Sequence, residues 1–242
     1  MGHDHSPSRL EQLPEEIKTE IIARAAKASR ATIRTVMSNI PGLTKAAIND
    51  HVYKNMELSV LTEHPLASLE IYKDLMAKCL EAGNPEAHYV KGVQEYFHHN
   101  NTVVGLHHLH LATKGSFQNA FYLYGIVMLC REEMEVGQEM FDKLAWRQCK
   151  ATTDKCWQDI KRTFHGIRVE RLPCYIETLK KQRQKRSNMN GDDFTGTWRT
   201  MPTTNIATMI EMMETMMEYL AQQDSANKAT NERLSFIPAA IA

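Results

Sequence analysis

The segment Ala87–Val93, which reads AHYVKGV, recurs 33 residues later as AFYLYGI at Ala120–Ile126. Ala, Tyr and Gly occupy identical offsets in the two copies. Further along, Gly105 is matched by Gly137, one residue short of the same period. A period of about 33 residues is typical of helix-turn-helix solenoid units. The sequence therefore predicts an array of helical repeats over residues 63–150.

The matched glycines Gly92 and Gly125 have a structural interpretation. A glycine inside a helix costs about 1 kcal/mol relative to alanine, so two at equivalent positions need a reason. Apolar residues continue beyond both, which argues against a simple helix break. We expect each glycine, lacking a Cβ, to let a paired helix approach closely.

The sequence pattern over residues 9–62 predicts three short helices. The first begins at Leu13-Pro14, with proline suited to the first helical position. Ser29 is expected to cap the second, which Pro41-Gly42 ends. A third is expected from about Thr44, with its inward face made by Leu43, Ala47, Ile48 and Val52. So small a unit forms a marginal core and is expected to lean on a neighbour or a partner.

Between this unit and the first repeat, an apolar helix from Pro65 is expected to stop at Gly83, with Asn84 capping the next helix and Pro85 opening it. Residues 1–8 are expected to form a flexible tail, and 151–186 a basic helical extension. Residues 187–242 read as a linker, a methionine-rich helix at 205–222 and a frayed end. That helix is expected either to dock on the repeats or to self-associate.

Composition excludes several classes of protein. The 242 residues carry 29 basic and 29 acidic side chains, so the chain as a whole is not expected to coat nucleic acid or membrane. Apolar runs fall short of the roughly 18 residues that a membrane span requires. Five cysteines without a CxxC pair read as reduced thiols. We expect an all-α protein of the cytoplasm, the nucleus or both.

Chemical motifs are not prominent. Five histidines gather within thirteen residues, and they are His98, His99, His107, His108 and His110. They favour a polar loop and a solvated helix face over a metal site, because carboxylates or cysteines at ligand spacing do not accompany them. Phosphate-binding loops and nucleophile patterns are not found either. We expect no cofactor, no metal and no catalytic residues.

Leu13–Ile17 (LPEEI), followed by Glu20-Ile21-Ile22, resembles the opening of an F-box. The resemblance to plant F-box proteins with Sel-like, tetratricopeptide-related repeats covers residues 9–146. The other segments that carry it are His51–Leu58, Cys79–Tyr89, Glu95–Phe97, Gly105–Leu109 and Leu129-Cys130.

This resemblance implies a substrate receptor of an SCF-type ubiquitin ligase, which would bind a Skp-family adaptor with its cullin complex and an unidentified target protein. The implied adaptor contacts are Leu13, Pro14, Ile17, Ile21, Ile22 and Val36. The alternative is that some of these side chains face the internal core. The implied target-binding surface of the repeats contains Tyr89, Tyr96, Tyr122 and Tyr124, although the Tyr-x-x-Gly spacing also suits packing between helices.

Two alternatives stay open. Ser38-Asn39 stands where family members usually carry Cys-Lys, and Pro41-Gly42 breaks the chain early, as in a repeat scaffold whose F-box is degenerate. The basic run that ends the extension is either a nuclear-import signal or a solvated helix end. The residues of this run are Lys180, Lys181, Arg183, Lys185 and Arg186.

Overall fold

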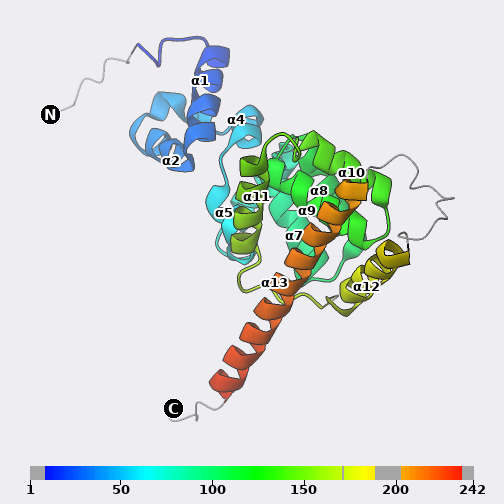
Figure 1. Ribbon diagram of the computed structural model, residues 1–242. Coiled ribbons are helices and arrows are strands. Elements are labelled where there is room, and N and C mark those ends of the chain that lie inside the picture. Colours follow the sequence, from blue (N-terminus) through cyan, green and yellow to red (C-terminus); the bar gives the residue numbers. More distant parts are fainter. Residues whose placement is uncertain (1–8, 171, 189–202, 236–242) are drawn as a thin grey trace.

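A computed structural model of the chain describes residues 9–170, 172–188 and 203–235 (Figure 1). These residues form thirteen α helices and no strand, so the predicted all-α class is confirmed. The helices are α1 (Glu15–Ala28), α2 (Arg30–Asn39), α3 (Thr44–Ala47), α4 (Asp50–Asn55), α5 (Ser59–Glu63), α6 (Lys73–Glu81), α7 (Pro85–Val93), α8 (Thr102–Lys114), α9 (Gln118–Cys130), α10 (Met134–Lys143), α11 (Lys150–Thr163), α12 (Leu172–Asn188) and α13 (Thr203–Ser235). The tail predicted at 1–8 lies outside the described residues, as does most of the predicted linker.

The N-terminal unit consists of α1 to α4 and the short 3-10 turn η1 (Pro41–Leu43). Pro14 stands one position before α1 rather than at its first residue. The predicted third helix is interrupted, since α3 ends at Ala47 and α4 starts at Asp50. Ile48 lies at that break and is 48% exposed, so its predicted inward position is wrong. One turn of helix is too short to carry the periodicity through to Ile48.

The repeats form two helical hairpins, α7 with α8 and α9 with α10, at the centre of the molecule (Figure 1). In the first hairpin, a Cβ added at Gly92 would lie 2.7 Å from Cγ of Leu109. One added at Gly105 would lie 2.6 Å from the backbone nitrogen of Tyr96. The paired helices thus touch at the glycines, as the sequence predicted.

The second hairpin repeats this arrangement. A Cβ added at Gly137 would lie 2.6 Å from Cδ2 of Leu129, and one at Gly125 would lie 3.1 Å from Cε2 of Phe141. Phe141 thus faces Gly125 as Leu109 faces Gly92. Leu129 likewise faces Gly137 as Tyr96 faces Gly105. The match confirms that the sequence repeat is a structural repeat.

A π turn, η3 (Gln94–His98), explains why the two copies differ by one residue. Gly92 and Gly105 are 13 positions apart, whereas Gly125 and Gly137 are 12 apart. The wider i to i+5 turn of a π helix accommodates an extra residue without leaving the helix. The corresponding part of α9 continues as a regular α helix.

Asn84 joins the N-terminal unit to the first repeat helix. It follows Gly83, whose φ is +75°, and its side-chain oxygen accepts hydrogen bonds from the backbone nitrogens of Glu86 and Ala87. This confirms the predicted N-cap. Its side-chain nitrogen also donates to the carbonyl oxygens of Tyr53 and Met56, over 2.9 and 2.8 Å. One side chain thus caps a helix and holds the end of α4.

The N-terminal unit shares its hydrophobic core with the repeats. Ile22, Leu43 and Val52 belong to the same buried cluster as Cys79 of α6 and Val90 of α7. In addition, the backbone nitrogen of Leu58 donates to Oε2 of Glu86 over 2.7 Å. The small unit is therefore completed in part by its own chain.

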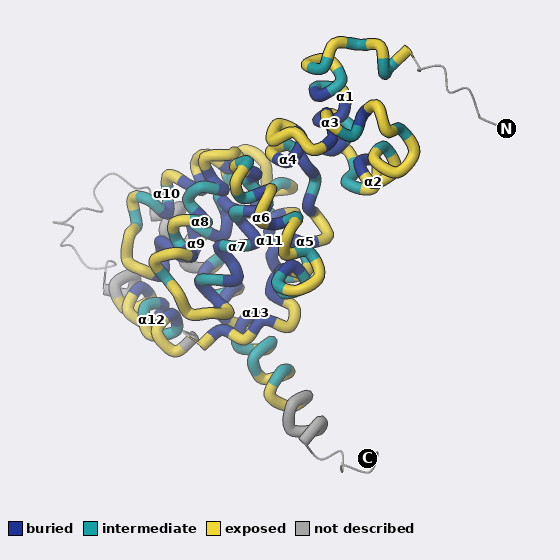
Figure 2. Tube along the Cα trace, turned by 180° about the vertical axis from the view of Figure 1, so that it is seen from behind, coloured by how far each residue is buried: buried dark blue, intermediate teal, exposed yellow. Residues whose placement is uncertain are grey.

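The C-terminal helices cover the repeats. Thr163 of α11 donates from Oγ1 to the carbonyl oxygen of Thr62 over 2.8 Å, which fixes α11 against α5. Met213, Met216 and Leu220 of α13 are buried in the repeat core. The helix continues past Gln222 to Ser235, and its last part projects beyond the repeats (Figures 1 and 2). No helix of the described segments combines the length and apolarity that crossing a membrane requires.

Candidate functional site

An exposed aliphatic pair lies on α1. Ile17 and Ile21, one turn apart, are 49% and 40% exposed. They are exposed because the opposite face of α1, made by Thr19, Ile22 and Ala26, turns inward. Just before the helix, Pro14 is exposed and Leu13 is half-buried. We call Leu13, Pro14, Ile17 and Ile21 the α1 aliphatic face. Figure 2 shows the N-terminal unit with long exposed stretches.

Two residues predicted to share this surface lie elsewhere. Ile22 is only 3% exposed and belongs to the core of the N-terminal unit, so its side chain is not presented to a partner. Val36 of α2 is half-buried and packs against the same core. Spacing of three and four residues from Thr19 and Ala26 puts Ile22 on the inward stripe.

Glu20 links α1, the helix that carries the aliphatic face, to α4. Its Oε2 lies 3.0 Å from Nε2 of His51 at the start of α4, and its Oε1 accepts a hydrogen bond from Nε of Arg24 over 2.7 Å. These contacts lower the pKa of the Glu20 carboxyl, the bond from Arg24 contributing most. The face therefore stands on a helix fixed to its neighbour.

Three of the four tyrosines predicted for a target-binding surface are core residues. Tyr89, Tyr96 and Tyr122 are buried, so this prediction is wrong for them. The hydroxyl of Tyr89 donates to Oγ1 of Thr163 over 3.3 Å, and burial raises its pKa. Their rings fill the space between hairpin helices that the glycines bring close. Only Tyr124 of the four is partly exposed, with its ring 5.6 Å from that of His110.

Sequence reasoning missed a pair of histidines. Nδ1 of His88 in α7 lies 2.9 Å from Nδ1 of His108 in α8, and their rings stack at 5.2 Å. One ring therefore donates and the other accepts, which requires both to be neutral or one to be charged. Burial, together with the charge of His88, lowers the pKa of His108 to about 4. Within the described segments, no three His, Cys, Asp or Glu side chains converge as metal ligands would.

The predicted basic run lies on α12, and part of it makes intramolecular ion pairs. Nε of Arg183 is 2.6 Å from Oε1 of Glu214 in α13, and this bond raises the pKa of Arg183. Nζ of Lys181 is 3.9 Å from Oε1 of Glu132. Lys180 is exposed. The side chains of Lys185 and Arg186 lie outside the described residues.

The thiols divide into buried and exposed groups. Burial raises the pKa of Cys79, Cys130 and Cys156 to about 12, so they are protonated and unreactive at neutral pH. Cys149 and Cys174 are free and exposed. Burial thus leaves the three core cysteines acting as small hydrophobic residues.

The comparisons with known proteins agree with this architecture. A family described as plant tetratrico peptide repeats matches residues 62–165. F-box protein At2g35280 of Arabidopsis thaliana is 34% identical over 139 residues, which cover 57% of this chain and 85% of that protein. No solved structure matches. The fold is thus that of a helical-repeat protein with a small helical N-terminal unit, and the chain belongs to the F-box proteins.

A second relative gives the same family. At1g67623 of Arabidopsis thaliana, which also carries F-box protein in its name, is 26% identical over 121 residues, covering 50% of this chain and 40% of that protein. The matched repeats are described as tetratricopeptide repeats. The finer expectation of Sel-like repeats stays a prediction.

Proposed function

We propose that the chain is the substrate-recognition subunit of an SCF-type E3 ubiquitin ligase. The α1 aliphatic face would bind a Skp-family adaptor, which links the chain to a cullin complex. The helical repeats would bind a target protein. Ubiquitin transfer is carried out by other subunits of such a ligase, so we propose no catalytic role for this chain.

The observation that carries the proposal is the exposure of Ile17 and Ile21 beside Leu13-Pro14 in a chain of the F-box family. Apolar side chains that remain in water on one helix face gain free energy when a partner covers them. Burying the exposed part of each isoleucine is worth on the order of 1 kcal/mol. Ile22 is left out of the proposed contacts because it is already buried.

The test is co-purification of the full chain with a Skp-family adaptor. Replacing Ile17 and Ile21 together by Asp is expected to abolish binding, because two charges would enter an apolar interface. Val103→Asp is the matched control, since Val103 of α8 is 79% exposed and lies outside the N-terminal unit. It is expected to bind normally.

Two results would contradict the proposal. One is adaptor binding that survives the Ile17 and Ile21 double substitution. The other is a failure of the unchanged chain to bind any Skp-family adaptor, which would favour the repeat scaffold with a degenerate F-box. Thermal unfolding of each variant shows that lost binding does not reflect lost folding. We further propose that the chain acts in the cytoplasm, the nucleus or both.

A further inference from the structure

A cleft lies where the N-terminal unit meets the beginning of the repeat region. Its volume is about 720 Å³, and it is walled by residues of α2, α4, α5 and the segment 71–75. Ile33, Tyr53 and Met56 contribute buried core side chains to it. A volume of several hundred Å³ is typical of sites that bind small ligands or short segments. The described residues that line this cleft are not part of the α1 aliphatic face.

Three large apolar side chains surround the opening. Met37, Val60 and Ile71 line the cleft and are 41%, 54% and 75% exposed. They come from three separate segments of the chain, namely α2, α5 and the residues before α6. Single exposed apolar residues need no explanation, but several gathered around one cleft indicate a binding surface.

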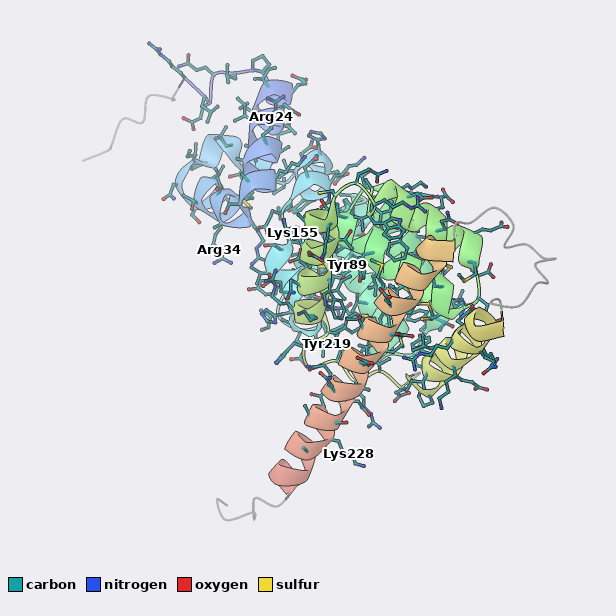
Figure 3. All side chains as sticks on the ribbon, in the orientation of Figure 1. Arg24, Arg34, Tyr89, Lys155, Tyr219 and Lys228 are labelled. Carbon is teal, nitrogen blue, oxygen red and sulfur yellow. The ribbon has the colours of Figure 1, made fainter. Side chains whose placement is uncertain are left out.

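The lining of the cleft also contains two arginines. Arg30 and Arg34 lie one turn apart on α2, and neither forms an ion pair within the part of the chain that the structure describes. The Arg30 guanidinium lies 4.7 Å above the centre of the Tyr72 ring, with its Nη1 shielded from water and lacking an acceptor. Figure 3 shows Arg34 projecting from the edge of the N-terminal unit.

Glu57 is the one acidic residue of the lining, and it does not neutralise both arginines. Its Oε1 accepts a hydrogen bond from the backbone nitrogen of Ser59 over 2.7 Å. The lining therefore has an excess of positive charge next to apolar surface. Guanidinium groups bind carboxylates through paired N–H donors.

We propose that this cleft binds a short peptide segment in which an acidic side chain stands beside apolar side chains. The carboxylate pairs with Arg30 and Arg34, and the apolar side chains cover Met37, Val60 and Ile71. That this peptide belongs to a protein targeted for degradation rests on the proposed function. The binding itself rests on the charge and the apolar rim of the cleft.

The experiment selects peptides from a random displayed library on the full-length chain and measures the affinity of enriched peptides by fluorescence polarisation. Enriched peptides are expected to contain Asp or Glu next to large apolar residues. Ile71→Glu is expected to weaken binding at least tenfold, because it adds a negative charge at a position exposed enough to tolerate it. Val103→Glu, at an equally exposed position outside the cleft, is expected to leave affinity unchanged.

Replacing Arg30 and Arg34 by Gln is expected to give a similar loss. The proposal is overturned if no peptide is enriched, if enriched peptides lack an acidic residue, or if Ile71→Glu leaves their affinity unchanged. It is also overturned if Ile71→Glu abolishes adaptor binding, since the adaptor would then occupy the cleft. Peptide binding by a chain that binds no adaptor would instead refute the receptor function and leave the cleft proposal standing.

Discussion

The side-chain amide of Asn84 donates a hydrogen bond to the carbonyl oxygen of Tyr53, which ties the first repeat helix to the N-terminal unit. Asn84→Ala is expected to destabilise the chain by about 2–4 kcal/mol. It removes a helix cap, leaves the buried carbonyl of Met56 without a donor, and leaves the carbonyl of Tyr53 with only the backbone N–H of Met56. Urea denaturation measures the loss.

Asn49→Ala provides the control for this substitution. Asn49 also caps a helix, accepting a hydrogen bond from the backbone nitrogen of His51, but it is exposed and bridges no second segment. Its loss is expected to cost only about 1 kcal/mol. Equal losses for Asn49 and Asn84 would show that the bridge to α4 adds nothing.

Alanine is expected to destabilise the chain at Gly105 but to leave its stability nearly unchanged at Gly125. Gly105→Ala would place a Cβ against the backbone of Tyr96, which cannot move without separating the helices. We expect a loss of about 1–3 kcal/mol. Gly125→Ala meets the edge of the Phe141 ring at 3.1 Å, Cβ of Met140 at 3.3 Å and the carbonyl oxygen of Gly137 at 3.4 Å, and the better helix propensity of alanine, about 1 kcal/mol, offsets these milder contacts.

Thermal unfolding of the two glycine variants tests this ordering. Gly125→Ala should unfold within about 2 °C of the unchanged chain, and Gly105→Ala several degrees lower. A Gly105→Ala chain as stable as the unchanged one would mean that the helices of the first hairpin do not touch at this point.

Glu86→Gln is expected to stabilise the chain increasingly as the pH rises from about 4.5 to 7. Burial raises the pKa of Glu86 to about 7, so the folded chain binds a proton that the unfolded chain has released. The unchanged protein therefore loses stability over this window, whereas Gln does not titrate. The difference is expected to reach about 1–3 kcal/mol above pH 7. Urea denaturation at several pH values would refute this if the difference stayed constant.

His108→Gln is expected to reduce the loss of stability on acidification. Because the pKa of His108 is lowered to about 4, the unfolded chain binds the proton first, and stability falls as the pH drops from 6.5 toward 4. His88, His107, Lys91 and Glu95 also act on this ring. Urea denaturation of both chains between pH 6.5 and 4 measures the difference, and an unchanged pH profile for His108→Gln would contradict the prediction.

Removing residues 188–242 is expected to lower the unfolding temperature by about 10 °C. The cut uncovers the part of the repeat core that Met213, Met216 and Leu220 fill. Removing only 225–242 should have little effect, because the described residues there are mostly exposed. Light scattering of both chains separates docking from self-association, since a smaller number of chains per particle after removing 188–242 would indicate the latter.

Local signals in the sequence were sufficient for the repeat and for the start of its first helix. Gly83, Asn84 and Pro85 predicted a helix end and a helix start through backbone conformation and capping, which depend on neighbouring residues alone. The matched glycines predicted that paired helices lie close together, because a close helix–helix contact is the reason for a glycine inside a helix. These features need no knowledge of distant parts of the chain.

Which side chains form the candidate surfaces depends on how the helices pack, and the sequence alone does not show this packing. Ile17, Ile21 and Ile22 are one residue type on one helix, and only the placement of neighbouring helices decides which is buried. The spacing of the repeat tyrosines allows both a surface and a core position, and packing buries three of the four. His88 and His108 are 20 positions apart on different helices, and nothing near either residue indicates the other.

The core shared by the N-terminal unit and the repeats has a mechanical consequence. Within the described residues, the N-terminal unit and the first repeat helix are linked by the hydrogen bonds of Asn84 and Glu86 as well as by the shared core. A partner held at α1 and a partner held by the repeats would keep a constant distance and orientation. Which lysines of a captured protein come within range of an enzyme would then follow from the geometry of this rigid spacer.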